Sequence, residues 1–342
     1  MAKLNDKTAL TFDDVALVPQ YNNVASRTEP DLSSWVTTFT KTGLPVIPAN
    51  MDTVMGPSLA KVCLNNGIPP IFHRFTDFNE KYLWLSEFGN DSYISCGCRD
   101  DHLQELVKLA DTSGKFFKGV CFDIAHGHST LMEKSIKEFK KEFPKAEVIA
   151  GNVCTAVAYH DLCNWGADAI KVGIGPGAAC TTRMVTGFGV PQLSAIMECS
   201  EVAERMRVPL IADGGIRDSR DIVLALAAGA SSVMMGKLFA LTMESAAEKD
   251  TSHSPVLAKY RGQASKDFQH GFYGGLKTGT VPEGESFWSP VSGSSQDLLD
   301  SLMGGLRSGL TYAGARTIKE LQRKAEFRVV TSTYMSESRP RK

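Results

Sequence analysis

A cysteine on a glycine-rich loop is the residue of this chain best suited to covalent chemistry. Cys180 ends the run Gly173-Ile-Gly-Pro-Gly-Ala-Ala-Cys and is followed by two threonines. Gly175, Pro176 and Gly177 force an unusual backbone path, and such a loop can turn carbonyls toward a cation or amides toward an anion. A thiolate presented there can attack an electrophilic carbon. The alternative is a turn with an incidental cysteine, and these residues alone leave both interpretations open.

Polar residues also follow other short apolar runs. Asp213-Gly-Gly215 and Gly236-Lys237 each end such a run, and barrels often bind phosphate at this place with loop amides. The Asp213 carboxylate suits the two hydroxyl donors of a ribose, although Asp-Gly-Gly is also ordinary turn chemistry. Asp123 is a candidate for cofactor or substrate contact. The nearby His126 and His128 lack a third metal ligand, which favours hydrogen-bonded structural roles over a metal site.

The elements that must position these residues are short β-type runs, each followed by a helical stretch. Strands that alternate with helices indicate parallel βαβ units, and eight units favour a closed (β/α)8 barrel, the TIM barrel, over an open doubly wound sheet. In such a barrel, catalytic residues lie at the carboxyl ends of the strands. The eight runs are Leu44–Ala49, Pro70–His73, Tyr93–Gly97, Gly119–Asp123, Glu147–Gly151, Ala169–Gly173, Pro209–Asp213 and Ser232–Gly236.

Two stretches do not fit the repeat. Residues 1–40 form an N-terminal extension. Residues from about 245 to 294 are rich in Gly, Ser, His and Pro with little periodicity, which predicts an irregular, mobile active-site flap. Helices are expected again at Gln296–Arg307 and Thr317–Phe327. We therefore expect residues 1–342 to form a single catalytic domain with the flap as an insertion.

The bulk composition excludes several functional classes. The chain has 342 residues, 43% of them hydrophobic, and a formal net charge of −1, which gives no support for nucleic-acid binding. No apolar run approaches the roughly 20 residues that span a bilayer. The N-terminus lacks the apolar core of a signal peptide, so a cytoplasmic location is expected and the eight cysteines are expected to be reduced thiols.

Ordered motifs along nearly the whole chain resemble those of the IMP dehydrogenase/GMP reductase family. They are Phe12-Asp-Asp-Val15, Ala49-Asn-Met-Asp-Thr53, Asp123 with AHGHS, Gly175-Pro-Gly, Cys180-Thr-Thr-Arg183, Gly187 with VPQLSA, Asp213-Gly-Gly and GGLRSGLTYAGA. The resemblance implies a (β/α)8 barrel, a homotetramer and a covalent thioimidate between Cys180 and purine C2.

The resemblance also implies the other site residues. Catalytic partners of Cys180 would be Thr182, Glu283 and Arg74. The cofactor NADPH would contact Asp123, Ala125, Asn152 and Arg74, and the backbone carbonyls of Gly175, Gly177 and Cys180 would hold a potassium ion. Lys237 stands where relatives have a small residue. The substrate would contact Met51, Asp213, Gly214, Gly215, Gly236, Lys237, Tyr260 and Gly262.

The two branches of the family share this machinery, and other features favour the reductase branch. Only Gly89-Asn-Asp91 joins the second helix to the third strand, where dehydrogenases commonly carry CBS modules. The flap has no Arg-Tyr pair of the kind that activates water in dehydrogenases, and Phe72-His-Arg-Phe75 is similar to one group of reductases. VPEGE and the terminal SESRP resemble dehydrogenases instead.

The expected reaction is the NADPH-dependent conversion of GMP to IMP and ammonia, a step of purine interconversion. The alternatives are an IMP dehydrogenase without CBS modules, which would form XMP with NAD, and a non-catalytic purine-nucleotide binder. The residues leave open NADPH against NADH and ribonucleotide against deoxyribonucleotide.

Overall fold

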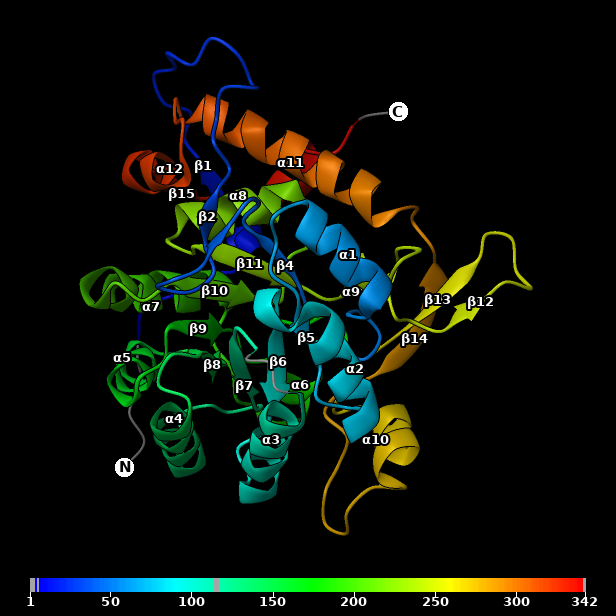
Figure 1. Cartoon of the computed structure of the whole chain (residues 1–342). Coiled ribbons are helices and arrows are strands. Elements are labelled where there is room, and N and C mark those ends of the chain that lie inside the picture. Colours follow the sequence, from blue (N-terminus) through cyan, green and yellow to red (C-terminus); the bar gives the residue numbers. More distant parts are fainter. Residues whose placement is uncertain (1–3, 5, 114–116, 341–342) are drawn as a thin grey trace.

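The computed structural model describes residues 4, 6–113 and 117–340 of the chain (Figure 1). The single domain expected over residues 1–342 also includes residues 1–3, 5, 114–116 and 341–342, which lie outside the described residues. Within the described residues the dominant feature is a sheet of parallel strands ringed by helices, with a smaller antiparallel sheet at one side.

Eight parallel strands wind into a nearly closed barrel. Their spatial order is β4-β11-β10-β9-β8-β7-β6-β5. The last of these eight strands along the chain, β11, therefore returns to pair with the first of them, β4. Within the described residues no ladder joins β4 to β5, which leaves a seam there. The return confirms the (β/α)8 barrel and excludes the open sheet. The bounds are β4 Val46–Pro48, β5 Ile71–Phe72, β6 Tyr93–Cys96, β7 Gly119–Asp123, β8 Glu147–Val153, β9 Ala169–Val172, β10 Leu210–Asp213 and β11 Ser232–Met235.

Helices follow the strands and form the outer ring. Several begin at a residue whose side chain accepts a hydrogen bond from a backbone amide of the first turn. These capping residues are Asp77, Ser129, Thr155, Asp218 and Ser294. Losing such a cap costs about 1 kcal/mol, so these residues fix where the helices start. The main helices are α1 Pro57–Asn65, α2 Phe78–Phe88, α3 Asp100–Ser113, α4 Thr130–Glu142, α5 Ala156–Trp165, α7 Gln192–Met206, α8 Ser219–Ala227 and α11 Ser295–Tyr312.

The core has two layers because each strand carries apolar side chains on both faces. One layer fills the barrel interior and the other lies between the strands and the helices. The interior layer consists of Val36, Ile47, Ala49, Ile71, Tyr93, Cys121, Ile149, Ala169, Ile211 and Met234.

A short hairpin closes the amino-terminal end of the barrel, which we call the floor. It is formed by β2 (Ser34–Trp35) and β3 (Lys41–Thr42). The buried Glu147, at the start of β8, accepts hydrogen bonds from the Thr40 hydroxyl at 2.8 Å and the Tyr93 hydroxyl at 2.8 Å, and a third from Thr37. The carboxylate thus ties the hairpin to the barrel at the end opposite the loops that follow the strands.

The segment from about 245 to 294 is more regular than its composition indicates. It forms an antiparallel sheet of β12 (Lys249–Asp250), β13 (Leu257–Arg261) and β14 (Ser286–Pro290), with α10 (Lys266–Tyr273) between the last two strands. The expectation of an irregular flap was therefore wrong in this respect. The reason is long-range pairing: all five residues of β13 pair with β14, which follows more than 20 residues later.

A strand near each end of the described chain pairs with the other outside the barrel. In the N-terminal extension, η1 (Phe12–Asp14) leads into β1 (Val15–Leu17), which pairs with β15 (Phe327–Val329). The remaining short helices are η2 Gly89–Asp91, α6 Thr182–Thr186, α9 Lys237–Ala240, α12 Ile318–Lys324 and α13 Tyr334–Glu337. In the described part of the chain, no helix combines the length and the apolar character needed to cross a membrane.

Candidate active site

One cavity of about 740 Å³ lies at the carboxyl ends of the barrel strands. This volume is within the range of about 300–1,000 Å³ that is usual for small-molecule sites. The structure thus brings together all the residues that the sequence analysis assigned to a site, while their individual roles remain predictions. These lining residues are Met51, Arg74, Asp123, Ala125, Asn152, Gly175, Gly177, Cys180, Thr182, Asp213, Gly214, Gly215, Gly236, Lys237, Tyr260, Gly262 and Glu283.

The cysteine loop connects β9 to α6. Gly175 has a φ of 85°, a conformation that favours glycine, and the Cys180 amide donates to the Gly177 carbonyl at 3.0 Å. The loop holds Cys180 half-buried at the cavity, where its Sγ lies 3.2 Å from the Thr182 hydroxyl oxygen. The thiol therefore faces the cavity beside a proton donor and acceptor.

The flap joins this loop through backbone hydrogen bonds. The Thr181 amide donates to the Glu283 carbonyl at 3.0 Å, and the Glu285 amide donates to the Ala179 carbonyl at 2.9 Å. Glu283 is thereby brought to the cavity wall. Among the described residues, the Thr182 hydroxyl makes a hydrogen bond with Cys180 Sγ, and no hydrogen bond joins it to the Glu283 carboxylate.

A buried lysine, which the sequence analysis did not single out, connects two candidate site residues. Lys171 lies in the middle of β9 with a side chain only 2% exposed, and its Nζ contacts Asp123 Oδ1 at 2.6 Å and Asp213 Oδ2 at 3.0 Å. The available signal was the charge itself, because Lys171 is the one ionisable residue in an otherwise apolar strand. A charge at such a position must be paired.

The pairing decides the charge states of this group. Burial by itself raises the pKa of Asp123, but the ammonium of Lys171, together with Arg74 and Asn50, more than offsets it and holds that pKa below its ordinary value. Burial likewise disfavours the charged lysine, yet Asp123 and Asp213 together keep the pKa of Lys171 above its ordinary value. Asp123 and Lys171 are therefore both ionised at neutral pH, and the ammonium lies between the carboxyl groups of Asp123 and Asp213.

Two asparagines complete this cluster. The Asn50 side-chain amide donates to Asp123 Oδ2 at 3.2 Å. The Asn152 amide donates to Asp213 Oδ2 at 2.9 Å and to the Gly173 carbonyl at 2.8 Å. Asn152, expected to contact the cofactor, is thus bonded to the aspartate expected to contact the ribose. With Oδ2 engaged by Lys171 and Asn152, Asp213 Oδ1 is left to accept bonds from a ligand.

Glycines shape the cavity at the ends of β10 and β11. Gly214 and Gly215 have φ values of 88° and 80°, which other residues rarely adopt. A methyl group on Gly236 would lie 2.6 Å from the Tyr260 hydroxyl oxygen and 3.2 Å from Met51 Sδ, so only glycine fits there. Burial, with the charges of Asp213 and Cys180, raises the pKa of Tyr260, which keeps its hydroxyl protonated as a donor.

Two cations stand at different sides of the cavity. Lys237 is exposed, and its Nζ lies 5.2 Å from the centre of the Phe287 ring. Arg74 lines both this cavity and an adjoining one of about 190 Å³, with its guanidinium 4.4 Å from the centre of the Phe75 ring. Arg74 lies on the side of Asp123, and its charge contributes to the lowered pKa of that carboxyl.

The remaining histidines and cysteines have other surroundings. His128 pairs with Asp161 at 2.8 Å, as expected of a hydrogen-bonded structural residue, and His126 is exposed. Among the described residues, no cluster of three His, Cys, Asp or Glu side chains could hold a metal ion. The cysteines outside the cavity are buried or half-buried free thiols, and burial raises the pKa of Cys98 to about 11.

Comparison with known proteins matches almost the whole chain to one family. The model of the IMP dehydrogenase / GMP reductase domain matches residues 9–87 and 94–341. The chain belongs to this family. The match is interrupted only at residues 88–93, which contain η2, the connection between α2 and β6.

Relatives from both branches of the IMP dehydrogenase/GMP reductase family match the chain. A GMP reductase from Streptococcus gordonii is 39% identical over 94% of this chain and 95% of its own length. Human GMP reductase 1 is 33% identical over 98% of this chain and 99% of its own length. An inosine-5'-monophosphate dehydrogenase from Aquifex aeolicus is 48% identical, but over 62% of this chain and 44% of its own length. The reductases therefore match this chain over nearly their whole length, whereas the dehydrogenase matches it over less than half of its own length.

Proposed function

We propose that this chain converts GMP to IMP and ammonia with NADPH, through a covalent bond between Cys180 and C2 of the purine. The observation that carries the proposal is the position of Cys180 Sγ, which is at the cavity wall and 3.2 Å from the Thr182 hydroxyl. The end-to-end similarity to proteins named GMP reductase supports the choice of substrate.

The first half of the reaction needs a nucleophile and an acid. The Cys180 thiolate attacks C2, the bond from C2 to the exocyclic nitrogen breaks, and ammonia leaves. An amine is a poor leaving group unless it is protonated, so a general acid is required. The Thr182 hydroxyl is adjacent to Sγ and can donate that proton, and Glu283, at the same cavity, is the group that can resupply it.

The second half would use a dinucleotide cofactor held at the wall of the same cavity. When bound, NADPH supplies the hydride that C2 accepts, after which the bond from C2 to sulfur breaks and IMP is released. Arg74, Asp123 and Ala125 line the wall available for it. The Arg74 guanidinium has no ion-pair partner among the described residues, so it is free to meet an anionic group of the cofactor.

The cysteine loop also has the donor set for a monovalent cation. In the described chain the Gly175 and Cys180 carbonyls accept no hydrogen bond, and the Gly177 carbonyl accepts one, from the Cys180 amide. A potassium ion held by these three oxygens would fix the loop that carries the nucleophile. We further propose the expected cytoplasmic location, homotetramer and role in purine interconversion.

The dehydrogenase alternative has one observation in its favour, the 48% identity to the Aquifex aeolicus protein. It requires a group that activates water for hydrolysis of the covalent intermediate. Residues 245–294 contain one arginine, Arg261, and its guanidinium is engaged by Asp52 at 2.9 Å and by Asp267 at 3.1 Å. An arginine held by two carboxylates is a poor base, which supports the reductase.

A direct assay separates the candidate functions. With GMP and NADPH, we expect the absorbance of the reduced nicotinamide to fall, and with IMP and NAD we expect no rise. The reverse pattern would establish the dehydrogenase, and no change in either mixture would leave a nucleotide-binding protein.

The first prediction concerns the nucleophile. Cys180→Ala is expected to lower turnover at least about a thousandfold, because the covalent route is removed, while GMP still binds. The matched control is Cys163→Ala on α5, a half-buried thiol outside the cavity, which should leave turnover unchanged. Equal turnover by the Cys180→Ala protein and the wild type would refute covalent catalysis.

A further inference from the structure

The segment Phe12–Val15 has no role in the proposed reaction, yet it forms part of the cavity wall. Thr11, Phe12 and Asp13 line the cavity beside the loop between β10 and α8. A methyl group built on Gly215 of that loop would lie 3.7 Å from Phe12 Cε2 and 3.3 Å from Pro176 Cβ. The N-terminal segment, the β10–α8 loop and the cysteine loop therefore lie in successive contact.

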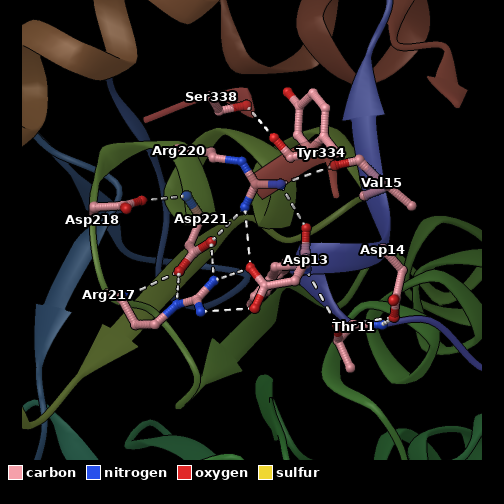
Figure 2. Close-up of polar contacts among 11 residues, drawn as sticks. Thr11, Asp13, Asp14, Val15, Arg217, Asp218, Arg220, Asp221, Tyr334 and Ser338 are labelled. Atoms are coloured by element: carbon pink, nitrogen blue, oxygen red, sulfur yellow. Dashed lines mark hydrogen bonds and ion pairs between the residues drawn. The ribbon is translucent and has the colours of Figure 1, made fainter. Parts of the chain in front are cut away.

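An arginine held between two carboxylates joins the segment to the loop (Figure 2). Arg217 donates to Asp13 through Nη1 at 2.9 Å and Nη2 at 2.6 Å. On its other side it donates to Asp221 through Nε at 2.8 Å and Nη2 at 3.2 Å, and its backbone amide also donates to Asp221 Oδ2 at 3.1 Å. We call Asp13, Arg217 and Asp221 the clamp.

A second arginine fixes the segment to α8. Arg220 Nη2 donates to the carbonyls of Phe12 at 2.8 Å and Val15 at 2.9 Å, and Nη1 lies 3.3 Å from Asp221 Oδ1 (Figure 2). Asp221 is fully buried, so its bonds to the two arginines are made away from water, where charge-assisted hydrogen bonds are strong. The outer pair of Asp13 and Arg217 is partly exposed and accordingly weaker.

The charges of the clamp indicate that Arg217 does not bind a phosphate directly. Arg217 already faces two carboxylates, so its positive charge is compensated and is not available to a phosphate. By contrast, the amides of Gly215 and Ile216 donate to no acceptor among the described residues, and both residues line the cavity. Consecutive free amides beside a helix amino terminus are suited to an anion.

We propose that Asp13, Arg217 and Asp221 are positioning residues for the 5'-phosphate of the nucleotide. They hold the β10–α8 loop in the conformation that leaves the Gly215 and Ile216 amides free for the phosphate. The N-terminal segment thus supports the nucleotide site, which gives the Phe12-Asp-Asp-Val15 motif a role in ligand binding. This inference rests on the proposed function in one respect, that the ligand is a purine nucleoside monophosphate.

The test compares a nucleotide with the nucleoside that lacks its phosphate. Calorimetric titrations of GMP, guanosine and inorganic phosphate are made with the wild-type protein and with Asp13→Asn, which keeps the size of the side chain but removes its charge. We expect the Kd for GMP to rise about tenfold and the Kd for guanosine to stay within about twofold. Asp13→Glu should restore most of the GMP affinity.

A second variant guards against a general loss of structure. Arg217→Lys keeps the charge but loses the two-pronged guanidinium bonds to Asp13 and to Asp221, so it should reproduce the selective loss. Glu204→Gln is the matched control, since Glu204 forms an exposed ion pair with Lys319 far from the cavity wall. It should leave both affinities unchanged.

Three outcomes overturn the inference. Equal losses of GMP and guanosine affinity in Asp13→Asn would mean that the clamp is merely structural. Wild-type GMP affinity in both Asp13→Asn and Arg217→Lys would mean that it has no role. A wild-type protein that binds no GMP would overturn the proposed function, and this inference with it, so the two failures are distinguishable.

Discussion

Lys171 carries a buried charge that joins two aspartates of the candidate site. It is buried between Asp123 and Asp213, which are predicted to face the cofactor and the ribose respectively. Sequence reasoning placed both aspartates at strand ends but treated the strand between them as apolar. Strand periodicity predicts which face a side chain occupies, whereas a partner two strands away, as Asp123 on β7 is from Lys171 on β9, is visible only in the folded barrel.

A prediction at this scale concerns the loss of that cation. Lys171→Met removes the cation that pairs two half-buried carboxyl groups, so we expect the free energy of unfolding at pH 7 to fall by about 3–5 kcal/mol. Urea denaturation measures the difference. Lys319→Met, which breaks an exposed ion pair, is the control and should cost less than about 1 kcal/mol.

The pH dependence provides a second readout of the same variant. In the wild type the pKa of Asp123 is lowered, so its contribution to stability is present above the ordinary value and is lost only as the pH falls through the lowered one. In Lys171→Met the largest lowering contribution is lost and burial of Asp123 raises its pKa, so protonation of that carboxyl relieves the cost. The stability deficit should therefore shrink between pH 8 and pH 5. A constant deficit over that range would contradict the charge argument.

At the scale of elements, helix α11 contains three glycines, and two of them, Gly305 and Gly309, pack closely against α8. A methyl group on Gly309 would lie 2.6 Å from Val223 Cγ2, and one on Gly305 would clash with Ser219. A methyl group on Gly304 would meet nothing within 4 Å. The same residue type is thus required for close packing at two positions of the helix and not at the third.

The corresponding prediction uses two substitutions in this one helix. Gly304→Ala should raise the free energy of unfolding by about 0.5–1 kcal/mol, because alanine restricts the unfolded chain and fits the helix. Gly309→Ala should lower it by about 1–3 kcal/mol, because the helix must move away from Val223. Chemical denaturation of the two variants measures both. Destabilisation of similar size in both would indicate that helix packing is not the cause.

The elements also show where sequence reasoning was sufficient and where it failed. The eight barrel strands were predicted because each is a short apolar run followed by a helix, and only β8 continues past its predicted end, to Val153. The sheet of the flap was missed although Ala258 and Tyr260 are buried and their neighbours in β13 are half-buried. Five residues of alternation are too few to identify a strand when its partner is far along the chain.

At the scale of the whole molecule, the barrel separates stability from chemistry. The cavity lies at one end of the strands and the Glu147 cluster lies at the other. Glu147→Gln is predicted to lower the free energy of unfolding by about 1–3 kcal/mol, because bonds between neutral groups replace charge-assisted ones. Turnover of GMP at saturation should not change. A fall in turnover at temperatures where the variant is fully folded would contradict this separation.

The turn η2 (Gly89–Asp91) lies on the floor of the barrel, where the Lys118 amide, just before β7, contacts the carbonyls of Gly89 and Ser92 at 2.9 Å and 3.2 Å. A domain inserted into this turn would therefore lie on the side away from the cavity and would leave the cysteine loop, the clamp and the flap in place. The fold thus allows a further domain to be added here without a change in the residues that line the cavity.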